Sequence, residues 1–167
     1  MSDMTEDLLL LARLDNKITP EYKNIDISIL IKNIVERMKP LVASKNIKLA
    51  YENSDSFIIK GVSEQLERVI LNILQNSIDH TPVGGSIELK LEKDGPKVVI
   101  HITDTGSGIA KKDLPHIFTR FYKGNSGAGT GLGLSIVKEI VEKHQGNITI
   151  ESELGKGTKV KIDFPIS

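Results

Sequence analysis

Apolar residues recur at helical spacing in four stretches of the chain. This spacing predicts helices over residues 4–15, 28–44, 63–80 and 131–145. Ser28 is a suitable N-cap for the second helix, because its hydroxyl can accept a hydrogen bond from an amide of the first turn. Pro82 and the glycines after it end the third helix.

The two longest predicted helices each have one apolar face. In 28–44 the inward positions are Ile31, Ile34, Val35, Met38, Leu41 and Val42. In 63–80 they are Leu66, Val69, Ile70, Ile73, Leu74 and Ser77. Each helix is therefore expected to cover a core with one side and to face water with the other.

Strand patterns account for most of the remaining chain. Short strands are predicted at 47–50 and 57–59, and alternating strands at 87–91, 98–102, 147–153 and 158–164. Turns at 94–96 and 155–157 join the alternating strands into two hairpins. The combination predicts an α+β two-layer sandwich, in which a mixed, mostly antiparallel sheet is covered on one face by helices. Residues 111–129 lack periodicity and predict a mobile loop.

The first predicted helix differs from the others, because it is apolar nearly all round. A helix of a dozen residues with this character is not expected to be stable alone in water. Residues 4–15 therefore resemble a helix cut from a larger bundle. Residues 17–24, which include Pro20, are predicted to be a linker.

Composition narrows the possible partners. Of the 167 residues, 22 are Lys or Arg and 22 are Asp or Glu, so the formal net charge is zero. Nucleic acid and anionic membrane surfaces both require a basic excess and are not expected as partners. The chain has no cysteine, which excludes disulfides and thiolate metal sites. No apolar run approaches the roughly 20 residues of a membrane-spanning helix, so we expect a cytoplasmic location for this chain.

Two asparagines stand out in the helix predicted over 63–80. Asn72 and Asn76 are four residues apart and therefore lie on one stripe, away from Ile73 and Leu74. Such a pair can simply be solvated, although asparagine is a poor residue for the middle of a helix. An amide oxygen is also a suitable ligand for Mg²⁺, which otherwise keeps several waters and prefers phosphate oxygens.

Two glycine clusters follow this helix along the chain. The first, 104–109, begins with Asp104 at the end of a predicted strand; Asp-x-Gly is common in ordinary turns, but a fixed carboxylate there could also accept the amine of adenine. The second, 129–134, opens a helix, where backbone amides without a nearby Cβ form an anion site. It is not a P-loop, because no Gly-Lys-Ser/Thr follows. A flexible connector would not explain its alternating leucines.

Together these motifs resemble the catalytic, ATP-binding domain of sensor histidine kinases, which has the Bergerat fold shared with gyrase, Hsp90 and MutL ATPases. The resemblance covers about residues 25–167. Its motifs are the asparagine box at 72–77, the glycine boxes at 104–108 and 129–134, the phenylalanine box at 117–123 and a C-terminal motif at 155–158. Four boxes in the family's order make this a specific signal.

The resemblance implies a role in binding Mg-ATP for each box. Asn76 would ligate Mg²⁺, Asn72 would position the phosphates or the waters of the metal, and Asp104 would bind the adenine amine. Lys123 and Arg120 would supply positive charge near the γ-phosphate. The pocket walls would be Gly108, Ile109, Leu132 and Leu134, the phosphate amides Gly131 and Gly133, and further nucleotide contacts His80, Gly106, Tyr122, Thr130 and Thr158.

Position 72 separates branches of this family. The ATPase relatives and the anti-sigma serine kinases usually carry a glutamate there, which acts as a base. This chain has Asn72 instead, and the amide of an asparagine cannot take a proton. A histidine acceptor already has a free lone pair, so Asn72 favours transfer of the γ-phosphoryl group to histidine by positioning and charge neutralisation. Asp79, where many members have a basic residue, and a short uncharged lid at 124–128 depart from the pattern. A serine kinase or ATPase and a nucleotide-sensing module without transfer stay open as alternatives.

None of the four histidines lies in the phosphoacceptor box of the family. Residues 4–15 resemble the tail of its second dimerisation helix. We therefore expect residues 1–20 to be the end of that helix plus a linker, and 21–167 to be the catalytic domain. The implied partners are the helical phosphoacceptor domain and a downstream response regulator. The full-length protein could carry a membrane anchor, although this fragment is expected to make no direct membrane contact.

Overall fold

The computed structural model describes residues 3–53, 55–124 and 129–167. The helices are α1 (Asp3–Asp15), α2 (Ile27–Ser44), α3 (Ser63–His80), the 3₁₀ helix η1 (Leu114–His116) and α4 (Gly133–Lys143). The strands are β1 (Lys23–Asp26), β2 (Lys48–Glu52), β3 (Ile58–Gly61), β4 (Ser86–Asp94), β5 (Lys97–Asp104), β6 (Asn147–Glu153) and β7 (Gly157–Pro165). Most of the lid predicted at 124–128 lies outside the described residues.

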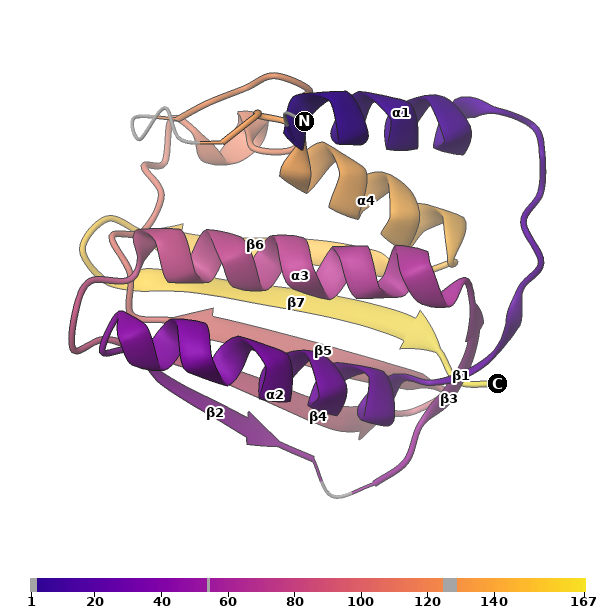
Figure 1. Cartoon of the computed structure of the whole chain (residues 1–167), viewed down its shortest axis with the longest axis horizontal. Helices are drawn as coiled ribbons and strands as arrows, with labels where there is room; N and C mark the ends of the chain where they lie inside the picture. The colour runs from indigo at the N-terminus through magenta and orange to yellow at the C-terminus, as the bar shows by residue number, and fades with distance from the viewer. Residues whose placement is uncertain (1–2, 54, 125–128) are drawn as a thin grey trace.

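The main sheet is mixed and mostly antiparallel, as predicted. Its five strands have the order β2-β4-β5-β7-β6, and only the pair β2 and β4 is parallel (Figure 1). The hairpin β4–β5 and the hairpin β6–β7 are joined by pairing of β5 with β7, which sets Asp104 opposite Thr158. Strands β1 and β3 form a separate two-stranded ribbon. This register brings the end of β5 next to the start of β7.

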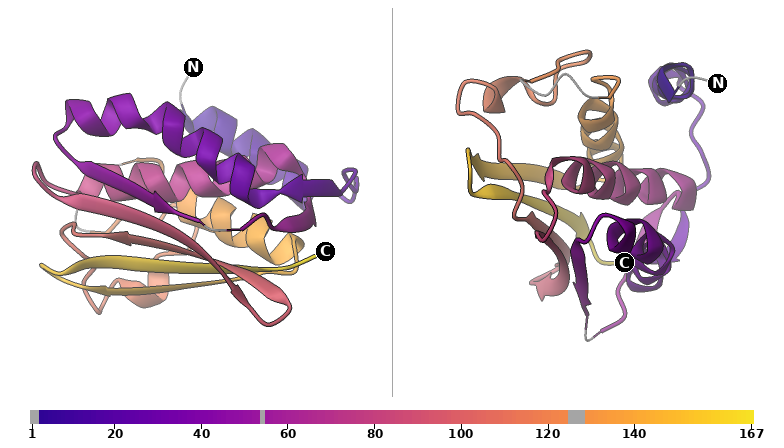
Figure 2. Two further views of the ribbon diagram at one scale, coloured as in Figure 1. Left: turned by 90° about the horizontal axis from the view of Figure 1, so that it is seen from below. Right: turned by 60° about the vertical axis from the view of Figure 1, so that its left-hand side comes forward.

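Helices α2, α3 and α4 lie together on one side of the sheet (Figure 2). The six inward positions predicted for α3 are all buried, and the five apolar ones pack in one core with the apolar face of the sheet. In α2, four of the predicted positions are buried, while Met38 and Leu41 are partly buried against that core. The two-layer α+β prediction is therefore confirmed.

Helix α1 lies outside these two layers and packs on α4 (Figure 2). Leu11 and Leu14 are each 3 % exposed, whereas Met4, Leu8 and Leu9 are exposed. Part of the apolar surface of this helix is therefore buried within this chain, and part of it is exposed. Its assignment as the end of a dimerisation helix stays a prediction. No helix in the described ranges is both long and apolar enough to cross a bilayer.

Several predicted boundaries were wrong. The N-cap of α2 is Asp26, whose carboxylate accepts from the amides of Ser28 and Ile29. The Ser28 hydroxyl instead donates to the carbonyl of Asp55 at 2.9 Å. Strand β1 occupies the end of the predicted linker, because its pairing with β3 supplies backbone partners. The stretch predicted as a mobile loop contains η1, and α4 begins at Gly133 rather than 131.

Candidate functional site

A single stripe of α3 carries four polar side chains at intervals of four residues. Arg68, Asn72, Asn76 and His80 follow one another along it, and all four are half-buried. The Asn72 side-chain nitrogen donates to the carbonyl of Gly133 at 3.2 Å. His80 Nδ1 donates to the carbonyl of Asn76 at 2.8 Å. No hydrogen bond to the side chain of Asn76 is formed among the residues that the structure describes, so its amide is available to a ligand.

The first glycine cluster lies against the carboxyl end of this stripe. Asp104 is 6 % exposed, and its Oδ1 accepts from the amide of Gly106 at 2.8 Å. The amide of Ser107 donates to the carbonyl of His80 at 3.0 Å. A Cβ at Gly106 would lie 2.7 Å from that same carbonyl oxygen, so only glycine allows this approach. Within the described ranges Asp104 Oδ2 has no hydrogen-bond partner, which leaves one carboxylate oxygen of this buried residue for a ligand.

Ser152 fastens the first glycine cluster to the start of β7, and sequence reasoning missed it. Its hydroxyl oxygen accepts from the amide of Ile109 at 2.8 Å and lies 2.8 Å from the hydroxyl of Thr158. It also donates to the carbonyl of Gly157 at 2.8 Å. These contacts fix the side chain of Thr158, which pairs with Asp104 across the sheet; its role in holding a purine stays a prediction. A lone serine in an alternating strand carried no signal that could have identified it.

The second glycine cluster forms the entry to α4. Gly131 has a φ of +77°, and a Cβ there would lie 2.8 Å from the backbone of Phe121. The amide of Phe121 donates to the carbonyl of Gly131 at 2.9 Å, which closes the base of the 121–131 segment. The hydroxyl of Thr130 accepts from the amide of Leu132 at 3.2 Å. Leu132 itself is fully buried in the core, while Leu134 is half-buried.

The residues of the predicted phenylalanine box lie apart from this stripe. The guanidinium of Arg120 lies 3.4 Å from a carboxylate oxygen of Asp15 and 3.2 Å from one of Glu139. The Tyr122 hydroxyl donates to Asp113, and this bond raises the pKa of the tyrosine. Lys123 is exposed. In the described part of the chain, none of these side chains is hydrogen-bonded to α3 or to Asp104.

Two of the cavities that the described residues form lie elsewhere on the molecule. One of about 520 Å³ lies along the outer face of α4, between Phe118, Lys138 and Glu142. The other, of about 180 Å³, lies beneath the residues that follow α1, next to Tyr22 and Gln65. Neither is lined by the asparagines or by Asp104.

The stripe offers few ligands, so it suits a metal ion that takes most of its oxygen ligands from a bound phosphate and from water. No group of three His, Cys, Asp or Glu side chains within the described ranges could hold a metal ion. A cation bound here would therefore take an amide oxygen from Asn76 and its other ligands from phosphate and water, as Mg²⁺ commonly does. The residues present fit that ion.

Comparisons with known proteins show which family this chain resembles. A family model described as histidine kinase-, DNA gyrase B-, and HSP90-like ATPase matches residues 61–167. The sensor histidine kinase RppB of a Synechocystis species is 36 % identical over 99 % of this chain and 38 % of its own length. The sensor protein kinase PmrB of Pseudomonas aeruginosa is 33 % identical over 99 % of this chain and 35 % of its own.

Among solved structures, full-length ShkA in complex with AMPPNP is similar, with a TM-score of 0.86 and 28 % identity over 98 % of this chain and 35 % of that one. The chain belongs to the family of histidine kinase-, DNA gyrase B- and HSP90-like ATPases. It spans between a third and two-fifths of the length of the curated relatives named above. The resemblance predicted from the four boxes is confirmed.

Proposed function

We propose that this chain binds Mg-ATP and transfers its γ-phosphoryl group to a histidine on a helical dimerisation domain, as the catalytic domain of a sensor histidine kinase. The observation that carries the proposal is the contact of one stripe of α3 with both glycine clusters. His80 meets Ser107 at one end, and Asn72 meets Gly133 nearer the other. A nucleotide laid along the stripe would therefore have its base at Asp104 and its phosphates at the start of α4.

The carboxylate of Asp104 supports recognition of adenine. Oδ1 is committed to Gly106, while Oδ2 can accept a hydrogen bond from the exocyclic amine. Gly106 and Gly108 let this turn pack closely against the backbone of His80 and Glu153, which fixes the carboxylate in place. Thr158 is half-buried next to Asp104 and supplies a hydroxyl to the same end of the site.

The phosphates would lie between Asn76 and the amino end of α4. Backbone amides in the first turn of a helix are not used within the helix and attract anions. Gly131 and Gly133 keep side chains away from these amides. Bound Mg²⁺ would neutralise charge on the phosphates, and Asn76 would hold it by its amide oxygen.

The choice of acceptor follows from the absence of a base at position 72. The Asn72 amide cannot accept a proton, and its nitrogen is bound to the carbonyl of Gly133. Activation of water or of a serine hydroxyl therefore has no group to perform it at this position. A histidine acceptor needs none, because neutral imidazole is itself a nucleophile. A response regulator would then receive the phosphoryl group.

Transfer can be tested by mixing the chain with the dimerisation domain that carries the histidine and with γ-labelled Mg-ATP. We expect acid-labile, alkali-stable label on the dimerisation domain, and loss of this label with Asn76→Ala. Nucleotide binding without any transfer would instead indicate a sensing module. Rapid steady hydrolysis by the isolated chain would indicate an ATPase.

A further inference from the structure

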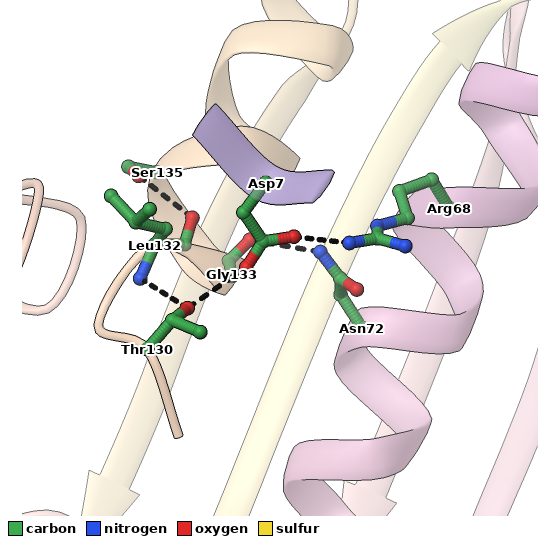
Figure 3. Close-up of polar contacts among 7 residues, drawn as sticks. All are labelled: Asp7, Arg68, Asn72, Thr130, Leu132, Gly133 and Ser135. Carbon is green, nitrogen blue, oxygen red and sulfur yellow. Dashed lines mark hydrogen bonds and ion pairs between the residues drawn. The ribbon is translucent and has the colours of Figure 1, made fainter. Parts of the chain in front are cut away.

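The carboxylate of Asp7 on α1 joins two elements of the candidate site. Asp7 is 5 % exposed, and one of its oxygens is ion-paired with the guanidinium of Arg68 on α3. Its other oxygen accepts a hydrogen bond of 2.8 Å from the hydroxyl of Thr130. Figure 3 shows Asp7 lying between these two side chains, next to Asn72 and Gly133. We call the three residues Asp7, Arg68 and Thr130 the Asp7 latch.

The latch lies at the end of the α3 stripe opposite to Asp104. Arg68 precedes Asn72 by four residues, so it continues the stripe by one turn away from His80 and the first glycine cluster. Thr130 also accepts from the amide of Leu132 at the start of α4. A triphosphate that runs along the stripe from Asp104 would direct its terminal phosphate toward this end.

We propose that Asp7 stands in for the terminal phosphate of the nucleotide, and that the two anions compete for Arg68 and Thr130. This inference rests on the function proposed above. A carboxylate and a phosphate seek the same partners, namely a guanidinium and donors at the amino end of a helix. Arg68 is thereby assigned as a residue that positions the terminal phosphate, and Asp7 as the group that masks it.

The consequence is that α1 covers the terminal-phosphate end of the site while the latch is closed. Helix α1 is otherwise held by Leu11 and Leu14 and by the contact of Asp15 with Arg120. Entry of a triphosphate releases Asp7, weakens the docking of α1 and opens this end to the acceptor. A diphosphate lacks the competing group and leaves the latch closed.

A purely structural ion pair would behave differently. If Asp7 and Arg68 served only to dock α1, their loss would change the affinities for diphosphate and triphosphate by the same factor. The ratio of the two affinities therefore separates the two roles.

The test is calorimetric titration of the 167-residue chain with Mg-AMPPNP and Mg-ADP. Asp7→Asn should raise the ratio of AMPPNP to ADP affinity by about tenfold, the effect of freeing one charge-assisted partner. Glu6→Gln is the matched control, because Glu6 is exposed on the same helix, and it should leave the ratio unchanged. Arg68→Gln, alone or with Asp7→Asn, should not raise the ratio, since the masked cation is then absent.

A measurement on the unaltered chain avoids any effect of substitution on folding. AMPPNP, but not ADP, should increase amide hydrogen exchange over residues 4–15. If both nucleotides bind but the affinity ratio of Asp7→Asn and the exchange of α1 are unchanged, the latch is wrong. Equal increases for both nucleotides would also overturn it. If no variant binds either nucleotide, the proposed function fails and the latch fails with it.

Discussion

The side-chain amide of Asn72 donates to the carbonyl oxygen of Gly133 at 3.2 Å. This bond joins the middle of α3 to the first residue of α4, and thereby sets the second glycine cluster beside the asparagine stripe (Figure 3). Asn72 is therefore more than a solvated residue on a helix face, because it holds two elements of the candidate site together.

Replacement of Asn72 by alanine should loosen this junction. Loss of one partly buried hydrogen bond is expected to lower the free energy of unfolding by about 1 kcal/mol. Phosphoryl transfer should fall more than nucleotide affinity, because the start of α4 would lose its fixed position relative to α3. Urea denaturation and single-turnover transfer measure the two effects. Gln75→Ala, on the exposed side of the same helix, is the control, and an equal loss of transfer there would contradict the assignment.

Replacement of Asp104 by asparagine should abolish recognition of adenine while preserving the fold. The remaining carbonyl oxygen of the amide can still accept from Gly106, so the turn should be retained. Without the anionic acceptor, ATP affinity should fall about a hundredfold, as expected for loss of a hydrogen bond to a charged group. Calorimetry with Mg-ATP measures this change. Unaltered affinity in a folded variant would refute the adenine role of Asp104.

Gly155 in the β6–β7 turn and Gly157 at the start of β7 provide a matched pair for testing close approach. Gly157 has a φ of +94°, and a Cβ there would lie 2.0 Å from the carbonyl oxygen of Asp104. Gly155 has a φ of +79° but open space around it. Gly155→Ala should cost about 1 kcal/mol of unfolding free energy from backbone strain alone, whereas Gly157→Ala should cost about 3 kcal/mol or more. Thermal denaturation of both variants checks the difference; similar losses would show that the contact with Asp104 is easily relieved.

The buried His144 should make stability depend on pH. Its Nδ1 donates to the carbonyl of Ile140 at 2.7 Å, and its Nε2 accepts from the amide of Val62 at 3.1 Å, so the ring is neutral. Burial lowers the pKa of His144 below its usual value of 6.5. Below about pH 6.5 the unfolded chain binds a proton that the folded chain does not, so stability should be full above this pH and fall as the pH decreases through it.

Urea denaturation between about pH 5 and pH 8 measures this dependence. His144→Gln should reduce the slope of stability against pH, although it also lowers stability at neutral pH. His101→Gln is the control for loss of a histidine, because His101 on β5 is half-exposed. A slope unchanged by His144→Gln would show that other groups produce the pH dependence.

Elements with a strong local pattern were predicted closely. The bounds of α3 were predicted as 63–80, because its apolar spacing is regular and Pro82 follows it directly. The start of α2 was misassigned, since Asp26 and Ser28 can both cap a helix and the pairing of β1 with β3 decides between them. A place for Arg120 near the γ-phosphate stays a prediction; in the structure its guanidinium lies between Asp15 and Glu139. Its box establishes family membership, but the direction of a long exposed side chain depends on neighbours distant in sequence.

By itself, the sequence determined the α+β class, the apolar faces of the helices, the strand end at Asp104 and the order of the four boxes. These features depend on periodicity and on glycine and proline within a few residues of one another. Only the tertiary structure decided that Ser152 fastens the first glycine cluster and that Asp7 joins Arg68 to Thr130. The bonds from Asp7 span 61 and 123 positions of the chain. Contacts at such separations form only when whole helices and strands pack, so no local pattern records them.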